Sequence, residues 1–167
     1  MTPASNPLEA FLIHVGALTW EDLVAGYDFG CLTPQDIQAE ASGVGPAVRR
    51  LRALLGLDLC EFEAHLWAAC TEVLGTTPRP GSSRWARAQD RWRAALLWEA
   101  LAVETTHGQL ALRVEAIYEQ VGCPEDMLAM LTPAQRWSGA PATLDPLALQ
   151  QFLATRAHTS RRLGAAC

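Results

Sequence analysis

The fold class is decided by the stretch SRWARAQDRWRAALLWEALAVET, residues 83–105. Its apolar residues recur at intervals of three and four positions and so form one stripe along an α-helix: Trp85, Ala88, Trp92, Ala95 and Leu96. At about 1.5 Å per residue, this helix is expected to be roughly 33 Å long. We therefore predict a long, tryptophan-rich helix at the centre of the fold.

The sequence on both sides of this stretch also carries helix signals. Thr19 and Thr33 are each followed three residues later by an aspartate, Asp22 and Asp36, which is the pattern of a capping box. These boxes and the apolar periodicity predict helices over residues 20–27, 34–41, 48–55, 59–74, 110–121, 124–130 and 145–162. Alternating β-branched residues and Asn-Gly or Asp-Gly hairpin turns are absent from the sequence. We therefore predict an all-α, compact multi-helix fold.

Length and loop signals favour one domain. A chain of 167 residues is within the usual size of a single domain. Residues 76–82 contain two prolines and a glycine and are expected to form an internal loop, but the halves on either side are small for separate domains. Residues 1–6 have the character of a disordered lead-in. We predict a single helical domain over residues 1–167.

Composition indicates a globular protein of the cytoplasm. Half of the residues are apolar and 19% are charged, as in chains that form a real core. No apolar run approaches the roughly 20 residues of a membrane span, and the first residues lack the basic and apolar regions of a signal peptide. The five cysteines are odd in number and widely spaced, which favours free thiols in a reducing compartment. We expect a cytoplasmic protein that makes no membrane contact.

The charge distribution along the chain is uneven. The formal net charge is −5, all 13 basic residues are arginine, and six acidic but no basic residues lie within residues 1–48. The overall negative charge argues against a general binder of nucleic acid or anionic membranes. The acidic N-terminal third instead favours a basic partner.

The residue types that usually carry catalysis or metal binding are scattered. The four histidines have no metal-ligand spacing, and the nearest pair, Glu61 and His65, is an ordinary i, i+4 contact on one helix face. Cys123 stands at a predicted helix N-terminus, a position that can activate a thiol, but Glu125 and Asp126 in the same turn oppose that effect. Nucleophile-elbow and phosphate-loop motifs are absent from the sequence. We predict no enzyme activity, no metal and no cofactor.

The candidate partner-binding site lies in the acidic N-terminal third. Aromatic and acidic residues are interleaved there and would form a negative surface with aromatic anchors for a basic protein: Trp20, Glu21, Asp22, Tyr27, Asp28 and Phe29. A second interpretation stays open. In it, Trp20 and Phe29 belong to the core, while Glu21 and Asp22 serve only the start of their helix.

An alternative site lies on the long helix. Arg84, Arg87 and Arg91 would grip phosphates while Trp85 or Trp92 stacks on a base, an arrangement typical of nucleic-acid binding. The two tryptophans, however, fall on the apolar stripe and favour a place in the core. The alternative hypothesis is therefore a nucleic-acid-associated or regulatory helical protein that uses this arginine face.

Three phrases of the sequence carry a resemblance to a known family. They are ALTWEDL at residues 17–23 with Gly26, the helix at residues 92–101, and Ile117-Tyr118 leading into CPEDM at residues 123–127. Over residues 8–131 the chain resembles a bacterial family known as domain of unknown function 2247. Small acidic bacterial families of this kind resemble the immunity proteins that neutralise toxins. The resemblance implies a non-catalytic protein-binding module, an immunity-type inhibitor that docks on a basic toxin domain.

Overall fold

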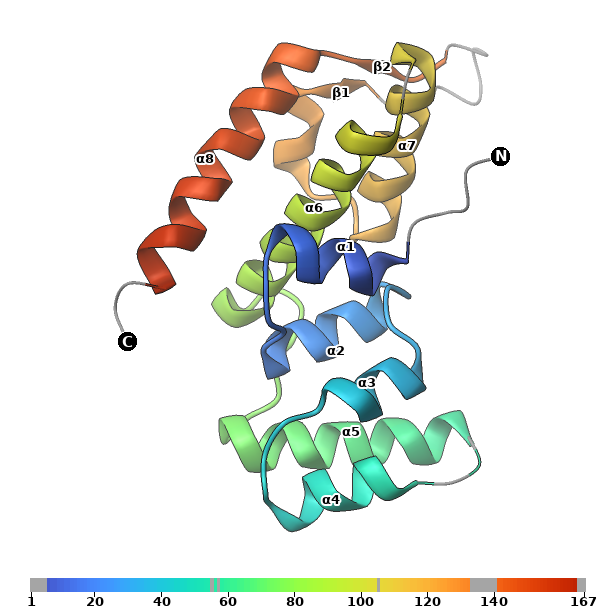
Figure 1. Cartoon of the computed structure of the whole chain (residues 1–167), viewed down its shortest axis with the longest axis vertical. Coiled ribbons are helices and arrows are strands. Elements are labelled where there is room, and N and C mark those ends of the chain that lie inside the picture. The colour runs from blue at the N-terminus through green and yellow to red at the C-terminus, as the bar shows by residue number, and fades with distance from the viewer. Residues whose placement is uncertain (1–5, 55, 57, 105, 133–140, 165–167) are drawn as a thin grey trace. The chain divides into compact units, whose positions relative to one another are not determined.

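The structure, a computed structural model, describes residues 6–54, 56, 58–104, 106–132 and 141–164. Within these residues it contains eight α-helices, one 3₁₀ helix and one pair of short strands (Figure 1). The elements in chain order are α1 (Pro7–His14), α2 (Trp20–Asp28), α3 (Pro34–Glu40), α4 (Pro46–Ala53), α5 (Leu59–Leu74), α6 (Ser83–Val103), α7 (His107–Gln120), η1 (Glu125–Ala129), β1 (Leu131–Thr132), β2 (Thr143–Leu144) and α8 (Pro146–Gly164). The all-α prediction is confirmed. The expected tryptophan-rich helix is α6, which at 21 residues is the longest helix in the described part of the chain.

The chain divides into two compact units. One is Gly16–Arg91, and the other combines Met1–Val15 with Trp92–Cys167, so the boundary falls inside α6. The division reflects how residues pack within each unit and does not test whether the two units form one domain. The single domain over residues 1–167 therefore stays a prediction.

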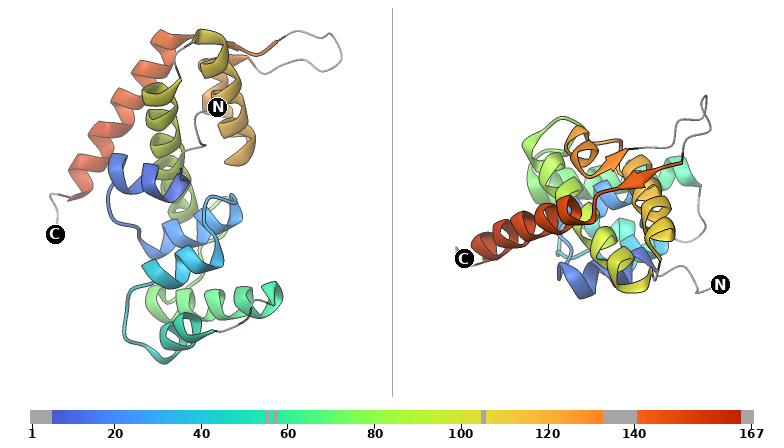
Figure 2. Two further views of the ribbon diagram at one scale, coloured as in Figure 1. Left: turned by 45° about the vertical axis from the view of Figure 1, so that its right-hand side comes forward. Right: turned by 90° about the horizontal axis from the view of Figure 1, so that it is seen from above.

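In the unit Gly16–Arg91, α4 lies along α5, and α2 and α3 pack beside them (Figures 1 and 2). Both predicted capping boxes are present. The Thr19 hydroxyl accepts the Asp22 N–H while the Asp22 carboxylate accepts the Thr19 N–H, and Thr33 and Asp36 repeat this exchange. The core of the unit consists of buried apolar side chains from its helices: Leu23, Val24, Ile37, Val48, Leu51, Phe62, Leu66 and Trp85.

In the other unit, the second half of α6 carries the main core residues. Trp92 is fully buried and packs on Phe11 of α1 with 4.4 Å between ring centroids. The buried Arg93 guanidinium binds the Asp126 carboxylate, Nη2 to Oδ2 at 2.9 Å, and lies 5.1 Å from the ring centroid of Phe152 in α8. The rest of this core comes from α6 to α8: Leu97, Val114, Ile117, Met127, Leu131, Leu149 and Leu153.

A few segments differ from the sequence predictions or lie outside the described residues. The strand pair, in which Leu131 faces Leu144, was not expected because two residues per strand are too few for an alternating pattern. The predicted lead-in lies outside the described residues except for Asn6, whose side chain caps α1. Residues 75–82 join α5 to α6 without a helix. No helix of the described residues is long and apolar enough to cross a membrane.

Candidate functional site

The six predicted partner-binding residues do not form one exposed surface. Trp20, Asp22 and Phe29 are buried, Glu21 and Tyr27 are half-buried, and Asp28 is exposed. The expectation that Trp20 and Phe29 act as surface anchors is corrected by their contacts in the core. The Trp20 indole N–H donates to the Ser42 carbonyl at 3.0 Å, and the Phe29 ring packs edge-on against Trp85 with centroids 5.6 Å apart.

Asp22 likewise serves the interior of the unit rather than its surface. Its fully buried carboxylate accepts the N–H and the hydroxyl of Thr19, both at 2.7 Å, and pairs with the Arg91 guanidinium at 2.8 Å. Arg91 also donates to the Ala17 carbonyl at 2.8 Å. Burial raises the pKa of Asp22, while Arg91 and the Thr19 hydrogen bonds act in the opposite direction. This ion pair ties the start of α2 to α6, so Asp22 is not part of a docking surface.

The arginines of α6 do not form an open basic face either. Arg91 is engaged by Asp22, and the half-buried Arg84 donates to the Leu74 carbonyl at the end of α5 at 3.3 Å. Only Arg87 of the three is exposed. Trp85 and Trp92 are buried and cannot stack on a base. The buried tryptophans therefore contradict the base stacking expected on this helix, whereas phosphate binding by Arg84, Arg87 and Arg91 stays a prediction.

The exposed part of the predicted site lies along α2 and α5. The Tyr27 hydroxyl donates to the Glu63 carboxylate at 3.4 Å, and the Tyr27 ring packs on Phe62 with centroids 5.4 Å apart. Burial and the Glu63 carboxylate raise the pKa of Tyr27. Asp28 is exposed, and Glu21 lies seven positions before it, which places both on the same side of α2. We refer to Glu21, Tyr27, Asp28 and Glu63 as the acidic ledge.

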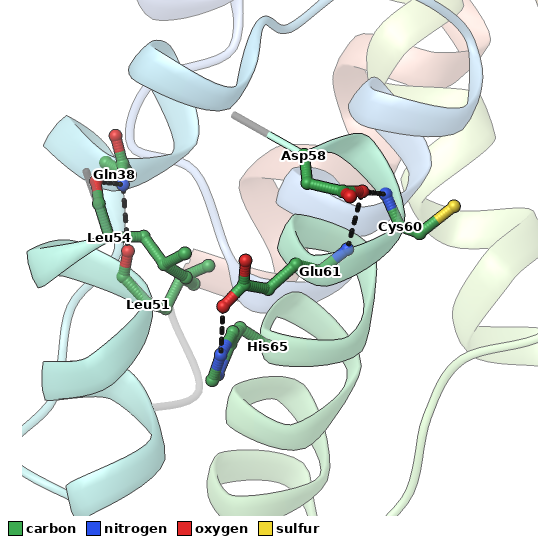
Figure 3. A network of polar contacts seen from close by, with 7 residues as sticks. All are labelled: Gln38, Leu51, Leu54, Asp58, Cys60, Glu61 and His65. Carbon is green, nitrogen blue, oxygen red and sulfur yellow. Dashed lines mark hydrogen bonds and ion pairs between the residues drawn. The ribbon is translucent and has the colours of Figure 1, made fainter. Parts of the chain in front are cut away.

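Metal-ligating and nucleophilic side chains are not grouped into a site among the described residues. Figure 3 shows Glu61 and His65 one turn apart on α5, with 3.9 Å between carboxylate and imidazole. In the part of the chain that the structure describes, no three His, Cys, Asp or Glu side chains could hold a metal ion. Burial raises the pKa of Cys31 to about 12 and that of Cys70 to about 11, so both thiols are held in the unreactive protonated form.

Two polar residues that the sequence analysis did not single out fix the ends of α4. The Gln38 amide of α3 donates to the carbonyls of Leu51 and Leu54, at 2.9 and 3.0 Å, at the C-terminus of α4 (Figure 3). At the other end, the Glu72 carboxylate of α5 accepts the Ala47 N–H at 3.0 Å. Because these caps come from other helices, no spacing in the sequence could have revealed them.

Comparison with known proteins identifies no relative: no family model, no curated protein and no solved structure matches the chain. The resemblance to domain of unknown function 2247 therefore stays a prediction.

Proposed function

We propose that this chain is a non-catalytic protein-binding module of the bacterial cytoplasm, an immunity-type inhibitor that docks on a basic toxin domain through the acidic ledge. The observation that supports the proposal is the ledge itself, in which the half-buried Tyr27 of α2 donates a hydrogen bond to the exposed Glu63 of the packed helix α5, while α2 also carries Glu21 and Asp28. The proposal keeps Glu21, Tyr27 and Asp28 of the predicted site and adds Glu63. Trp20, Asp22 and Phe29 support the ledge from the core.

The ledge has the physical properties of a docking surface for a basic protein. Tyr27 is held by its ring contact with Phe62 and by its hydrogen bond to Glu63, so little conformational entropy is lost when a partner covers it. Tyrosine supplies a large contact area with a polar tip and is enriched at binding hot spots. The carboxylates attract a basic partner over a Debye length and so accelerate the encounter.

The acidic character continues along the contact between α2 and α5. The negative charge of Glu21 adds to the raised pKa of Cys70, which is mainly caused by burial of the thiol. Tyr27 reaches Glu63 of α5, and Glu21 and Asp28 lie seven residues apart on α2. Because seven residues of an α-helix span about two turns, the ledge is long enough to meet several basic side chains.

The test begins with affinity purification of the tagged chain from its native cells, with a nuclease-treated control. We expect one stoichiometric protein partner that survives the nuclease, and we expect Glu63→Lys to slow its association about tenfold and to weaken the salt dependence. Glu9→Lys is the matched control, because it makes the same charge change at an exposed residue of α1, outside the two helices that carry the ledge. Equal association rates for the two variants would refute docking at the ledge, and recovery of nucleic acid alone would refute a protein-binding module.

A further inference from the structure

The segment that joins α3 to α4 displays an apolar side chain to solvent. Val44 is 86% exposed, more than any other large apolar residue of the described chain. A single exposed apolar side chain is ordinary on a protein surface. Here, however, the backbone that carries Val44 is fixed from several directions. We call residues 42–45 the presenting loop.

Side chains from two helices hold the carbonyls of the presenting loop. The Trp20 indole N–H of α2 donates to the Ser42 carbonyl at 3.0 Å, and the Arg49 guanidinium of α4 donates to the Val44 carbonyl. Trp20 is itself buried, so its hydrogen bond anchors the loop to the core of the unit. The loop is therefore ordered without using the Val44 side chain.

The presenting loop contains two glycines, Gly43 with a positive φ and Gly45 against the Glu72 carboxylate. Gly43 has φ +125°, and a Cβ placed there would lie 3.5 Å from Val48 and 3.8 Å from Val73. A Cβ at Gly45 would overlap the Glu72 carboxylate that caps α4. A larger residue at position 43 would be strained by the positive φ, and one at position 45 would displace the Glu72 carboxylate from its cap, so each glycine has its own role in the loop.

The solvent face of α4, directly after this loop, is formed by arginine. Arg49, Arg50 and Arg52 are all exposed; Arg49 and Arg50 lie opposite the buried Val48 and Leu51, and Arg52, one turn after Val48, lies at the edge of the buried side. No ion pair with a carboxylate is recorded for any of the three within the described residues. Three like charges in one turn of helix repel one another, which costs stability unless another charge compensates them.

We infer that the presenting loop and the arginine face of α4 form a second docking surface, for a protein partner that offers an apolar recess edged by carboxylates. Val44 enters the recess, and Arg49, Arg50 and Arg52 pair with the carboxylates around it. Because the loop is already rigid, binding loses little conformational entropy, and the buried apolar side chain becomes the anchor of the interface. Arginine is enriched at such interfaces because its fork binds carboxylates in two places.

Charge favours a protein over a nucleic acid as the occupant. The chain carries a net charge of −5, so its overall charge repels a long polyanion such as a nucleic acid. A protein partner with only a few carboxylates at its binding site would bring them against the arginine face alone. The acidic ledge has the opposite sign and takes a basic partner, so this second surface is independent of the proposed function. A variant that fails on one surface leaves the other intact.

The experiment places a photo-crosslinking amino acid at position 44 of the full chain in its native cells. Leu59 is the matched control position, since it is also a large apolar residue at an exposed site. We expect one protein to be crosslinked from position 44 and not from position 59. We also expect R50E/R52E to abolish the crosslink, while Arg79→Glu, which reverses an exposed arginine outside α4, leaves it unchanged.

The crosslinked protein is then identified, purified and titrated against variants whose circular dichroism matches that of the unaltered chain. We expect Val44→Asp to raise its Kd by about 30-fold or more, the effect of losing a hot-spot residue. The inference is overturned by a crosslink that persists in R50E/R52E, by equal crosslinking from position 59, or by the absence of any crosslink. Crosslinking to a second copy of this chain or to nucleic acid alone also overturns it.

Discussion

Replacement of Arg91 by methionine is expected to destabilise the unit Gly16–Arg91 strongly. Arg91 is the counter-ion of Asp22, whose carboxylate is 0% exposed. Removal of one partner of a fully buried ion pair costs ~3–5 kcal/mol, because the other charge stays buried and uncompensated. The Arg91 side chain is 27% exposed, so water already screens part of the pair. We therefore expect a loss of about 2–3 kcal/mol in the free energy of unfolding, slightly below that range.

The assay is urea unfolding followed by far-UV circular dichroism at several pH values. The expected loss lowers the midpoint by about 1–3 M urea. Arg87→Met is the matched control, since Arg87 lies one turn earlier on α6, is exposed, and should change stability by less than about 0.5 kcal/mol. Equal losses in the two variants would refute the assignment of Arg91 as the essential partner of Asp22.

The pH dependence gives a second, independent signature. Burial raises the pKa of Asp22 above its ordinary value of 3.8, and Arg91 is the main influence that lowers it. Without Arg91, the pKa rises further, so the folded state keeps a proton that the unfolded state releases. Stability is then lost as the pH rises from 3.8 through the folded pKa and is recovered as the pH falls. A variant whose deficit is the same at pH 4 and pH 7 would contradict this account.

Three further outcomes are expected. Gly45→Ala and Glu72→Ala should each lower the free energy of unfolding by about 1 kcal/mol. The two losses should not add in the double variant, because both substitutions remove the same cap of α4; urea unfolding midpoints of the three variants check this. Iodoacetamide at pH 8 should label Cys60 in the folded protein but reach Cys31, with a pKa of about 12, only after unfolding, as peptide mass mapping would show. Trp20→Phe should lower the free energy of unfolding by about 1 kcal/mol and speed amide hydrogen exchange in the presenting loop. Unchanged exchange rates would show that the Trp20 indole does not hold the loop in place.

The helices that are capped by their own sequence could be predicted well. Thr19 and Thr33 form the expected capping boxes, Asp58 caps α5, and α5 ends at Gly75, which has the left-handed φ of +72°. These signals lie within a few residues of the helix end that they fix. The prediction began α4 at residue 48, two residues late, although Pro46 occupies the favoured first position of the helix. The Glu72 cap at this start is distant in the sequence and close only after folding.

The candidate site was predicted less well for the same physical reason. The alternation of acidic and aromatic residues on α2 does not show which side chains meet Ser42, Trp85 or Arg91, and these distant contacts bury Trp20, Phe29 and Asp22. Exposure therefore could not be derived from local composition. The exposed part that remains is Glu21, Tyr27 and Asp28, of which Tyr27 contacts α5 through Phe62 and Glu63.

The caps of α4 also explain how its surface can be specialised. A helix of eight residues that begins at a proline after a glycine is too short to be stable alone. Gln38 and Glu72 satisfy its ends, and Val48 and Leu51 bury its inner face, so its stability comes from neighbouring helices. Its solvent face need not contribute helix-stabilising charge pairs, and arginine is the only charged residue type there. The long-range contacts that hold α4 thus leave the arginine face and the presenting loop available for binding.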